Sequence, residues 1–303
     1  MKMGIMTGAD GGRHTLEDLI AFGQKVEAAG FDQLWMANVR SFDALMALTF
    51  IARATQRIEV GTAVTPTPPR HPSALAQQAL TAAAATNNRF TLGIGPSHKI
   101  VTEDMLGLSF AQPARHTREY LQVLMPLLRG EVVNFDGDEY RVHGLQLDVP
   151  NARPPQVLVA ALGPVMLKLT GELADGTSTW MVGPKTMEAH IIKNLRAAAS
   201  AAKRPAPRVL GGFPLVLTNK VDEVRQSLAQ VLAIYGQLPS YRAMLDREGL
   251  RGPQDLALVG DEATLRREIK RIADTGVTDF NASIATGDTE TFERTFQFLA
   301  SVK

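Results

Sequence analysis

Residues 58–95 read IEVGTAVTPTPPRHPSALAQQALTAAAATNNRFTLGIG. Two short apolar runs in this stretch, Ile58–Thr62 and Phe90–Ile94, predict buried β-strands. Between them, Pro72–Thr86 is rich in alanine, a strong helix former, and begins with a proline, which suits the first helical turn. A strand, a helix and a second strand in this order predict a βαβ unit with parallel strands.

The same alternation extends to both ends of the chain. Further strands are predicted at Met3–Thr7, Gln33–Met36, Val157–Ala160, Gly176–Met181, Arg208–Leu217 and Val277–Ser283. Helical stretches separate them, among them Thr15–Ala29, Phe42–Ala54, Val165–Ala174 and Asp261–Thr275. Seven or eight strands, each followed by a helix and without a change of composition between the halves, predict one (β/α)₈ TIM barrel over residues 1–303. A doubly wound open sheet is the competing architecture.

Three segments interrupt the pattern. Glu131–Leu147 alternates on both sides of Asp136-Gly137-Asp138 and predicts a β-hairpin. Pro96–Pro113 is a long connection without clear period, and Gln237–Pro253, with its Gly and Pro residues, is predicted to be a mobile excursion. These two loops carry Met105, Leu106, Leu108, Phe110, Met244 and Leu245. Their apolar side chains predict either a lid over a partly hydrophobic substrate or packing onto the barrel or a second subunit.

Composition excludes several classes of function. Lys and Arg number 32 and Asp and Glu 31, so the chain lacks the basic excess that nucleic-acid binding requires. Without cysteine there is no disulfide, thiolate nucleophile or cysteine-held cluster, so redox chemistry needs a bound organic cofactor. No uncharged apolar run reaches the length of about 18 residues that a membrane span needs. The first residues lack the features of a secretory signal, and we therefore expect a cytoplasmic protein.

In a TIM barrel, chemistry is found where the strands end and the following loops converge. The residues at these positions are Asn38 and Arg40, Thr62 to Thr65 (Thr62, Ala63, Val64, Thr65), Gly95 to His98, Ala161 to Pro164, and Trp180. The strand-end residues are therefore the candidates for a functional site.

The segment Gly93-Ile94-Gly95-Pro96-Ser97-His98 resembles the start of a dinucleotide fingerprint, but the third glycine is missing and Pro96 withholds a backbone donor. Its glycines would let a flat ligand approach the backbone, although a simple tight turn explains them equally well. His98 is a candidate for moving a proton near neutral pH, with an ordinary surface histidine as the alternative.

The segment Ala160-Ala161-Leu162-Gly163-Pro164-Val165-Met166 passes from a strand into a helix. Pro164 suits the first helical turn, and the free amides at that helix end predict a site for a phosphate. A short turn without any ligand is the alternative. The stiff, proline-rich loop that ends at His71-Pro72 can form a pocket wall. His71 is interpreted as a helix-entry residue in preference to a cofactor contact.

Other chemistries find little support. The six histidines do not fall at metal-ligand spacings, so we predict no metal site. No Gly-x-Ser-x-Gly elbow is present, and Ser97 follows Pro96 without the strained turn that exposes a serine nucleophile, which disfavours hydrolase chemistry. The basic run Arg266, Arg267, Lys270 and Arg271 is intermixed with acids and is interpreted as a solvated helix face.

An ordered set of segments resembles the bacterial luciferase-like flavin and deazaflavin oxidoreductases. The segments are Ala28–Trp35, Arg57–Thr62, Arg70-His71-Pro72, Arg89–Gly95, Arg129–Val132, Ala174-Asp175-Gly176, Val259–Glu262 and Gly276–Phe280. The resemblance implies a TIM barrel that binds coenzyme F420 or FMN, and a homodimer or higher homo-oligomer. It also implies that the cofactor phosphate lies near Leu162-Gly163-Pro164, and that Asn38, Thr62 to Thr65, Ser97 and His98 contact the ring. The stretch from Ala160 to Met166 looks more like the F420-dependent branch.

One departure from the family affects the mechanism. Deazaflavin dehydrogenases of this family commonly carry an Asp-His pair after the second strand, where this chain has Asn38 and Val39. We therefore expect hydride transfer between deazaflavin C5 and a small organic substrate, with His98 in place of the missing histidine, Asn38 orienting ring or substrate, and Leu162, Gly163, Met166 and Ser97 anchoring the tail. An FMN-dependent monooxygenase and a non-catalytic cofactor-binding protein are the alternatives.

Overall fold

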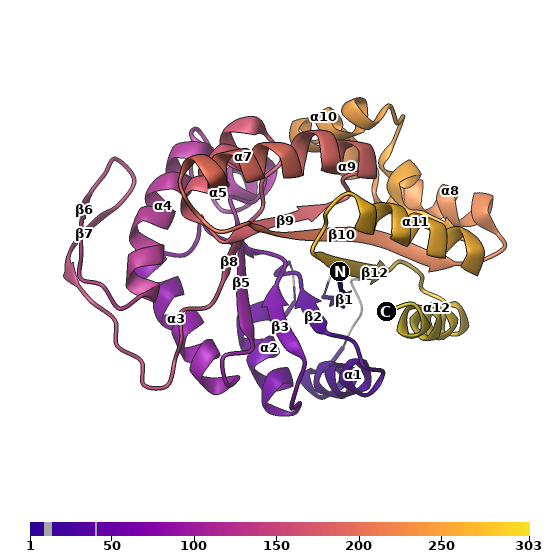
Figure 1. The fold of residues 1–303 in the computed structure, drawn as a ribbon, viewed down its shortest axis with the longest axis horizontal. Coiled ribbons are helices and arrows are strands. Elements are labelled where there is room, and N and C mark those ends of the chain that lie inside the picture. The colour runs from indigo at the N-terminus through magenta and orange to yellow at the C-terminus, as the bar shows by residue number, and fades with distance from the viewer. Residues whose placement is uncertain (9–13, 40) are drawn as a thin grey trace.

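The structure is a computed structural model that describes residues 1–8, 14–39 and 41–303. In these residues eight parallel strands follow one another around a ring (Figure 1). In ring order they are β1 (Lys2–Thr7), β2 (Gln33–Met36), β3 (Glu59–Thr62), β5 (Phe90–Gly95), β8 (Val157–Val159), β9 (Gly176–Trp180), β10 (Arg208–Leu217) and β12 (Asp279–Ile284).

Hydrogen-bonded pairing closes this ring. β1 pairs in parallel with both β2 and β12, and β10 pairs in parallel with both β9 and β12. A ring of parallel strands has no free edge, so the predicted (β/α)₈ barrel is confirmed and the open-sheet alternative is wrong. The observed bounds of the predicted strands agree with the sequence to within two residues.

Helices cover the outside of the ring (Figure 1). They are α1 (Leu16–Ala28), α2 (Ala44–Arg53), α3 (Pro72–Ala85), α4 (Pro113–Leu128), α5 (Pro164–Leu173), α6 (Pro184–Thr186), α7 (Lys193–Ala201), α8 (Val221–Val231), α11 (Glu262–Asp274) and α12 (Thr289–Ser301). Most of their apolar faces and the outward sides of the strands form one continuous core, in which Phe31, Tyr120 and Phe296 are among the largest buried side chains. Leu228 of α8 packs in a second, smaller cluster with Leu232 and Leu245.

Several elements lie outside the basic repeat. β6 (Val133–Asp136) and β7 (Arg141–Leu145) form the predicted antiparallel hairpin, which projects from the edge of the molecule (Figure 1). A two-residue strand, β4 (Thr65–Pro66), pairs with the end of β5. β11 (Leu258–Gly260), which the sequence does not predict, pairs with Leu215–Leu217 of β10, beyond the residues that pair with β9.

Both irregular loops contain more structure than predicted. The prediction of a mobile excursion over Gln237–Pro253 is wrong, because α10 (Pro239–Glu248) occupies most of it and follows directly on α9 (Ala233–Gln237). Met244 and Leu245 of α10 are buried, so they pack inward. In the other loop, Ile100–Met105 forms a π-helix, and Met105, Leu106 and Leu108 are exposed.

The barrel lumen is filled from below in layers. The lowest layer is polar, and the Arg208 guanidinium lies at its centre. Arg208 pairs with Glu59 at 2.7 Å and with Asp279 at 2.8 Å, and it also donates to Thr91 and Gln156. Burial alone would raise the pKa of Glu59, but Arg208 and hydrogen bonds from Thr91, Arg208 and Lys2 lower this pKa to about 2.

The next layer is apolar. Trp35 is fully buried, its indole N–H donates to Gln33, and the Arg208 guanidinium lies 5.4 Å from its ring centroid. Leu158 and Leu210 complete the layer. A Cβ atom at Gly61 would lie 2.3 Å from the Trp35 ring, so only glycine leaves room for the indole here. Trp35 therefore closes the lumen below the carboxyl ends of the strands.

Candidate cofactor site at the barrel mouth

The site lies at the carboxyl ends of the strands, above Trp35. Successive inward positions are two residues apart, so Ala37, Ala63, Gly95, Ala160 and Ser283 come next above the apolar layer. All five side chains are small or absent. Ala63, Ala160 and Ser283 are half-buried rather than buried, which means that the mouth is open to solvent. A floor of small side chains leaves space for a flat ring to lie on the strand ends.

Three predicted segments meet at this floor. A Cβ atom at Gly95 would lie 2.9 Å from Val64 Cγ2 and 3.0 Å from the Ala160 Cβ. The loops after β3, β5 and β8 thus converge, as the barrel predicts, and the backbone at Gly95 is approached closely. The peptide bond between Ala63 and Val64 is cis.

The two predicted threonines differ in what they offer. Thr62 is fully buried, and its hydroxyl donates to the Gly93 carbonyl at 2.7 Å and accepts from the Gly93 amide at 2.9 Å. This hydroxyl cross-links β3 and β5. Its single hydrogen is already donated, and its full burial keeps it from a ligand at the mouth. The Thr65 hydroxyl is also buried, but it has no hydrogen-bond partner among the described residues. Such a group normally has a partner, so Thr65 is the better candidate for a polar ligand contact.

The loop after β5 carries Ser97 and His98. Ser97 has φ +64°, in the left-handed region that non-glycine residues seldom adopt. The sequence prediction that Ser97 lacks a strained turn is therefore wrong, although a π-helix instead of an ordinary helix follows it. His98 is half-buried at the start of that π-helix, and burial lowers the pKa of its imidazole. At neutral pH His98 is uncharged and can accept a proton.

Asn38 lies after β2, half-buried, and its side-chain oxygen accepts from the Ala44 amide at 2.9 Å. That bond holds the start of α2, so the Asn38 amide group is what remains to donate to a ligand. Arg40, the other candidate from this loop, lies outside the described residues.

The helix that follows β8 begins with Gly163 as its N-cap and Pro164 at its first position, as predicted. In the described chain, side chains cap the starts of α1, α2, α3, α11 and α12. α5 has no side-chain cap, and neither have α4, α6, α7, α8, α9 and α10. The amides of Val165 and Met166 therefore remain free, at the positive end of the helix dipole. No atom lies within 4 Å of a Cβ built on Gly163, so an anion can reach them.

A histidine that sequence reasoning missed supports this loop. His190 is buried in a π-helix over Met187–Ile192, and its Nε2 lies 2.8 Å from the Leu162 carbonyl oxygen. Because a carbonyl only accepts, Nε2 carries the proton. Nδ1 then accepts from the Asn194 amide at 3.2 Å. No histidine spacing in the sequence predicts this contact, which joins two segments that are 28 residues apart.

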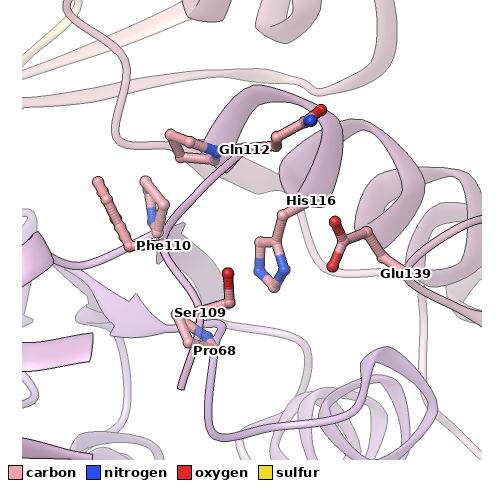
Figure 2. A pocket seen from close by; sticks show the side chains of 8 residues that line it. Pro68, Ser109, Phe110, Gln112, His116 and Glu139 are labelled. Carbon is pink, nitrogen blue, oxygen red and sulfur yellow. The ribbon is translucent and has the colours of Figure 1, made fainter. Parts of the chain in front are cut away.

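Two cavities lie away from the floor. The smaller, of about 20 Å³, holds no more than one water and is lined by Phe110, His116 and Glu139, among others (Figure 2). His116 Nε2 lies 2.9 Å from the Thr67 hydroxyl, so the imidazole ties α4 to the loop after β4. The larger is an open groove of about 500 Å³ between α11, α12 and the end of β10. Of the strand-end candidates, Pro96 alone lines the smaller cavity, and none lines the larger.

The surroundings of the site test two predictions, one for His71 and one for the basic run of α11. His71 is the N-cap of α3 and accepts from the Ser73 amide, which confirms the helix-entry interpretation. Ion pairs with acids of α11 engage the basic run from Arg266 to Arg271, as expected for a solvated face. Within the described residues, no group of three or more acidic or histidine side chains is arranged to hold a metal. Among the described helices, none has the length and apolarity needed to span a membrane.

Sequence comparison identifies the family. The chain belongs to the luciferase-like monooxygenase family, whose sequence profile matches residues 1–279, and this confirms the resemblance. A 5,10-methylenetetrahydromethanopterin reductase of Methanolobus tindarius is 27% identical over 230 residues, which cover 76% of this chain and 70% of that protein.

Solved structures show the same fold. The coenzyme F420 dependent tetrahydromethanopterin reductase of Methanopyrus kandleri matches with a TM-score of 0.82 and 21% identity, over 99% of this chain and 97% of that one. The oxygenating constituent of 3,6-diketocamphane monooxygenase from Pseudomonas putida, in complex with FMN, matches with a TM-score of 0.77 and 15% identity, over 99% and 97%.

Proposed function

We propose that this protein is an F420-dependent oxidoreductase that transfers a hydride between the deazaflavin and a small organic substrate at the barrel mouth. One observation carries the proposal: a floor of small residues adjoins a helix start whose amides are free and open to solvent. A tricyclic ring with a phosphate-bearing tail fits this combination. The name of the structurally similar Methanopyrus kandleri enzyme, a coenzyme F420 dependent reductase, supports F420.

The chain's own residues would hold such a cofactor without a cation. The amides of Val165 and Met166 would bind the phosphate, with Leu162 and Gly163 forming the loop ahead of them. Val64 and Gly95 would provide the backbone against which the ring packs, and Thr65 would offer its hydroxyl. When bound, F420 supplies a two-electron hydride carrier.

His98 provides the proton that accompanies hydride transfer. Its imidazole is uncharged at neutral pH, so it takes a proton from a substrate hydroxyl, or returns one in the reverse direction. Asn38, with its oxygen held by Ala44, presents its amide to the ring or the substrate. The protein thereby contributes orientation and proton transfer.

FMN is the alternative cofactor, and one comparison favours it: the diketocamphane monooxygenase with the same fold binds FMN. FMN also combines a tricyclic ring with a phosphate. Equilibrium titration of the purified protein with F420, FMN and riboflavin distinguishes the two proposals. Binding of F420 at least about tenfold tighter than FMN supports the first, and the reverse order supports an FMN-dependent monooxygenase. If neither cofactor binds, both proposals fail.

A further inference from the structure

Four aromatic side chains form a continuous row beside the mouth. Trp180 ends β9, Tyr235 lies on α9, Tyr241 on α10, and His98 follows β5. The ring centroids lie 6.5 Å apart for Trp180 and Tyr235, 5.0 Å for Tyr235 and Tyr241, and 6.0 Å for Tyr241 and His98. Edge and tilted contacts at these distances are favourable. The row joins the loops after β5 and β9, with β8 between them in the ring.

The chain places α9 and α10 after β10, yet α10 is anchored to the loop after β9. The Glu248 carboxylate accepts from the amides of Lys185 at 3.1 Å and Thr186 at 2.7 Å. A Cβ atom on Gly183 would lie 2.2 Å from Glu248 Cδ, so the backbone has been brought close to this carboxylate. The anchored end of α10 fixes the place of Tyr241 relative to the mouth.

The row carries no net charge at neutral pH. Burial raises the pKa of the Tyr235 and Tyr241 phenols and lowers the pKa of His98. Charged neighbours are already paired: Arg242 with Asp246 at 2.8 Å, and Lys99 with Glu103 at 3.6 Å. An anionic substrate would therefore meet aromatic rings and compensated charges here.

The row nevertheless offers hydrogen-bond donors. The Tyr241 hydroxyl makes no hydrogen bond to another residue in the described part of the chain. The Trp180 indole nitrogen is also buried without a partner among the described residues. The indole lies close enough to lower the pKa of the Tyr235 phenol against the larger effect of burial, but the distance and angle between the indole and the phenol do not make a hydrogen bond. Both donors suit a carbonyl oxygen.

We propose that Trp180, Tyr235 and Tyr241 form the substrate wall of this site, that they accept a planar, uncharged, conjugated carbonyl compound such as a quinone, and that Tyr241 determines this specificity. The inference rests on the proposed function, because the wall faces the mouth where the cofactor ring is placed. Tyr241 contributes one aromatic face and one hydroxyl, and the two contributions can be separated by substitution.

The test measures binding to the purified chain without cofactor. The probes are 1,4-naphthoquinone and its 2-sulfonate, which share a ring system but differ in charge. Quenching of tryptophan fluorescence reports binding, since Trp180 lies in the row whereas Trp35 is fully buried in the lumen. Trp180→Phe identifies the source of the signal. The absence of cysteine removes thiol addition to the quinone as a complication.

We expect the neutral quinone to bind at least about tenfold more tightly than the sulfonate. Tyr241→Leu should weaken the neutral quinone about tenfold, and Tyr241→Phe about threefold, because the ring remains. Tyr140→Leu is the matched control: Tyr140 is another half-buried tyrosine, on the hairpin side of the molecule, and should leave binding unchanged.

Three results overturn the inference: no saturable binding of the quinone, equal affinity for the sulfonate, or an affinity of Tyr241→Leu within twofold of the parent. Failure of the proposed function is distinct from these. It appears as an absence of F420 and FMN binding, measured separately, while the quinone preference and the Tyr241 effect persist.

Discussion

His190 Nε2 donates to the carbonyl oxygen of Leu162 at 2.8 Å, and both belong to the surroundings of the α5 start. The buried imidazole holds the last carbonyl before Gly163, and Asn194 fixes its tautomer from the other side. This pair makes the geometry of the free amides depend on a residue that does not itself face the ligand.

Replacing His190 should therefore weaken phosphate binding selectively. In His190→Ala the Leu162 carbonyl loses its donor, and we expect FMN or F420 affinity to fall about tenfold, with riboflavin, which has no phosphate, affected much less. His190→Gln retains a donor and should recover part of the loss. The exposed His143→Ala on the hairpin is the control. An equal loss for riboflavin and FMN would contradict the role of His190 in positioning the phosphate loop.

Gly163→Asp separates stability from binding. An aspartate at this N-cap has space for its side chain, and its carboxylate accepts from the free amides, so the free energy of unfolding should stay constant or rise by about 0.5 kcal/mol. The same carboxylate occupies and repels the phosphate position, and cofactor affinity should fall about 100-fold. Gly163→Ala controls for the added Cβ. Undiminished cofactor affinity in the aspartate variant would place the phosphate elsewhere. Thermal melts and equilibrium titrations supply the two measurements.

His98 should control the pH profile of quinone reduction. Hydride transfer to a quinone carbonyl leaves an oxygen anion that must take a proton, so the imidazole has to be protonated in this direction. Burial lowers the pKa of His98, and the protonated form is therefore gained only as the pH falls through this lowered pKa. We expect kcat/KM, measured with reduced cofactor and naphthoquinone, to rise in acid below the ordinary histidine pKa of 6.5 and to decline as the pH increases. His98→Gln should lower kcat/KM about 10²- to 10⁴-fold and remove this dependence. An unchanged pH dependence in the variant would exclude His98 as the titrating group.

The ion pairs below Trp35 predict a pH-dependent stability. Because the pKa of Glu59 in the folded state is lowered from 4.5 to about 2, its contribution is complete above pH 4.5 and is lost as the pH falls towards 2. The shift corresponds to at most about 3 kcal/mol at neutral pH. Glu59→Gln should be destabilised by about 2 kcal/mol at pH 7, and the difference from the parent should shrink at pH 3.

Urea unfolding at both pH values measures this effect. Glu131→Gln is the control, since Glu131 pairs with Arg129 on the exposed surface and should leave the unfolding curve unchanged. A constant difference between Glu59→Gln and the parent from pH 7 to pH 3 would show that the charge of Glu59 does not contribute.

The barrel is predictable from the sequence because its strands are short apolar runs. Between them lie helices whose apolar residues recur with a clear helical period. Thr15, Asp261 and Asp288 cap helices in the structure, and such caps mark boundaries in the sequence. β11 could not be predicted, because three residues are too few to show the alternating pattern of a strand. The strand also forms only because β10 is long enough for Leu215–Leu217 to pair with it.

The error over Gln237–Pro253 has a physical reason. Proline and glycine are typical of loops, but here Pro239 begins α10 and Gly249, with φ +84°, ends it. In the site, strand-end position alone identified the segments that converge on Gly95. The roles of Thr62 and His190 depend on partners distant in sequence, Gly93 and Leu162, and no local pattern encodes them.

Trp35 and the Arg208 ion pairs leave the lumen no passage from below, so the mouth is both entrance and exit. A cofactor ring that lies on the floor of small residues would be covered by whatever then occupies the space beside Tyr241. A quinone held beside Tyr241 before the cofactor arrives would obstruct this single entrance. The two ligands would then compete for access, although each has contacts of its own.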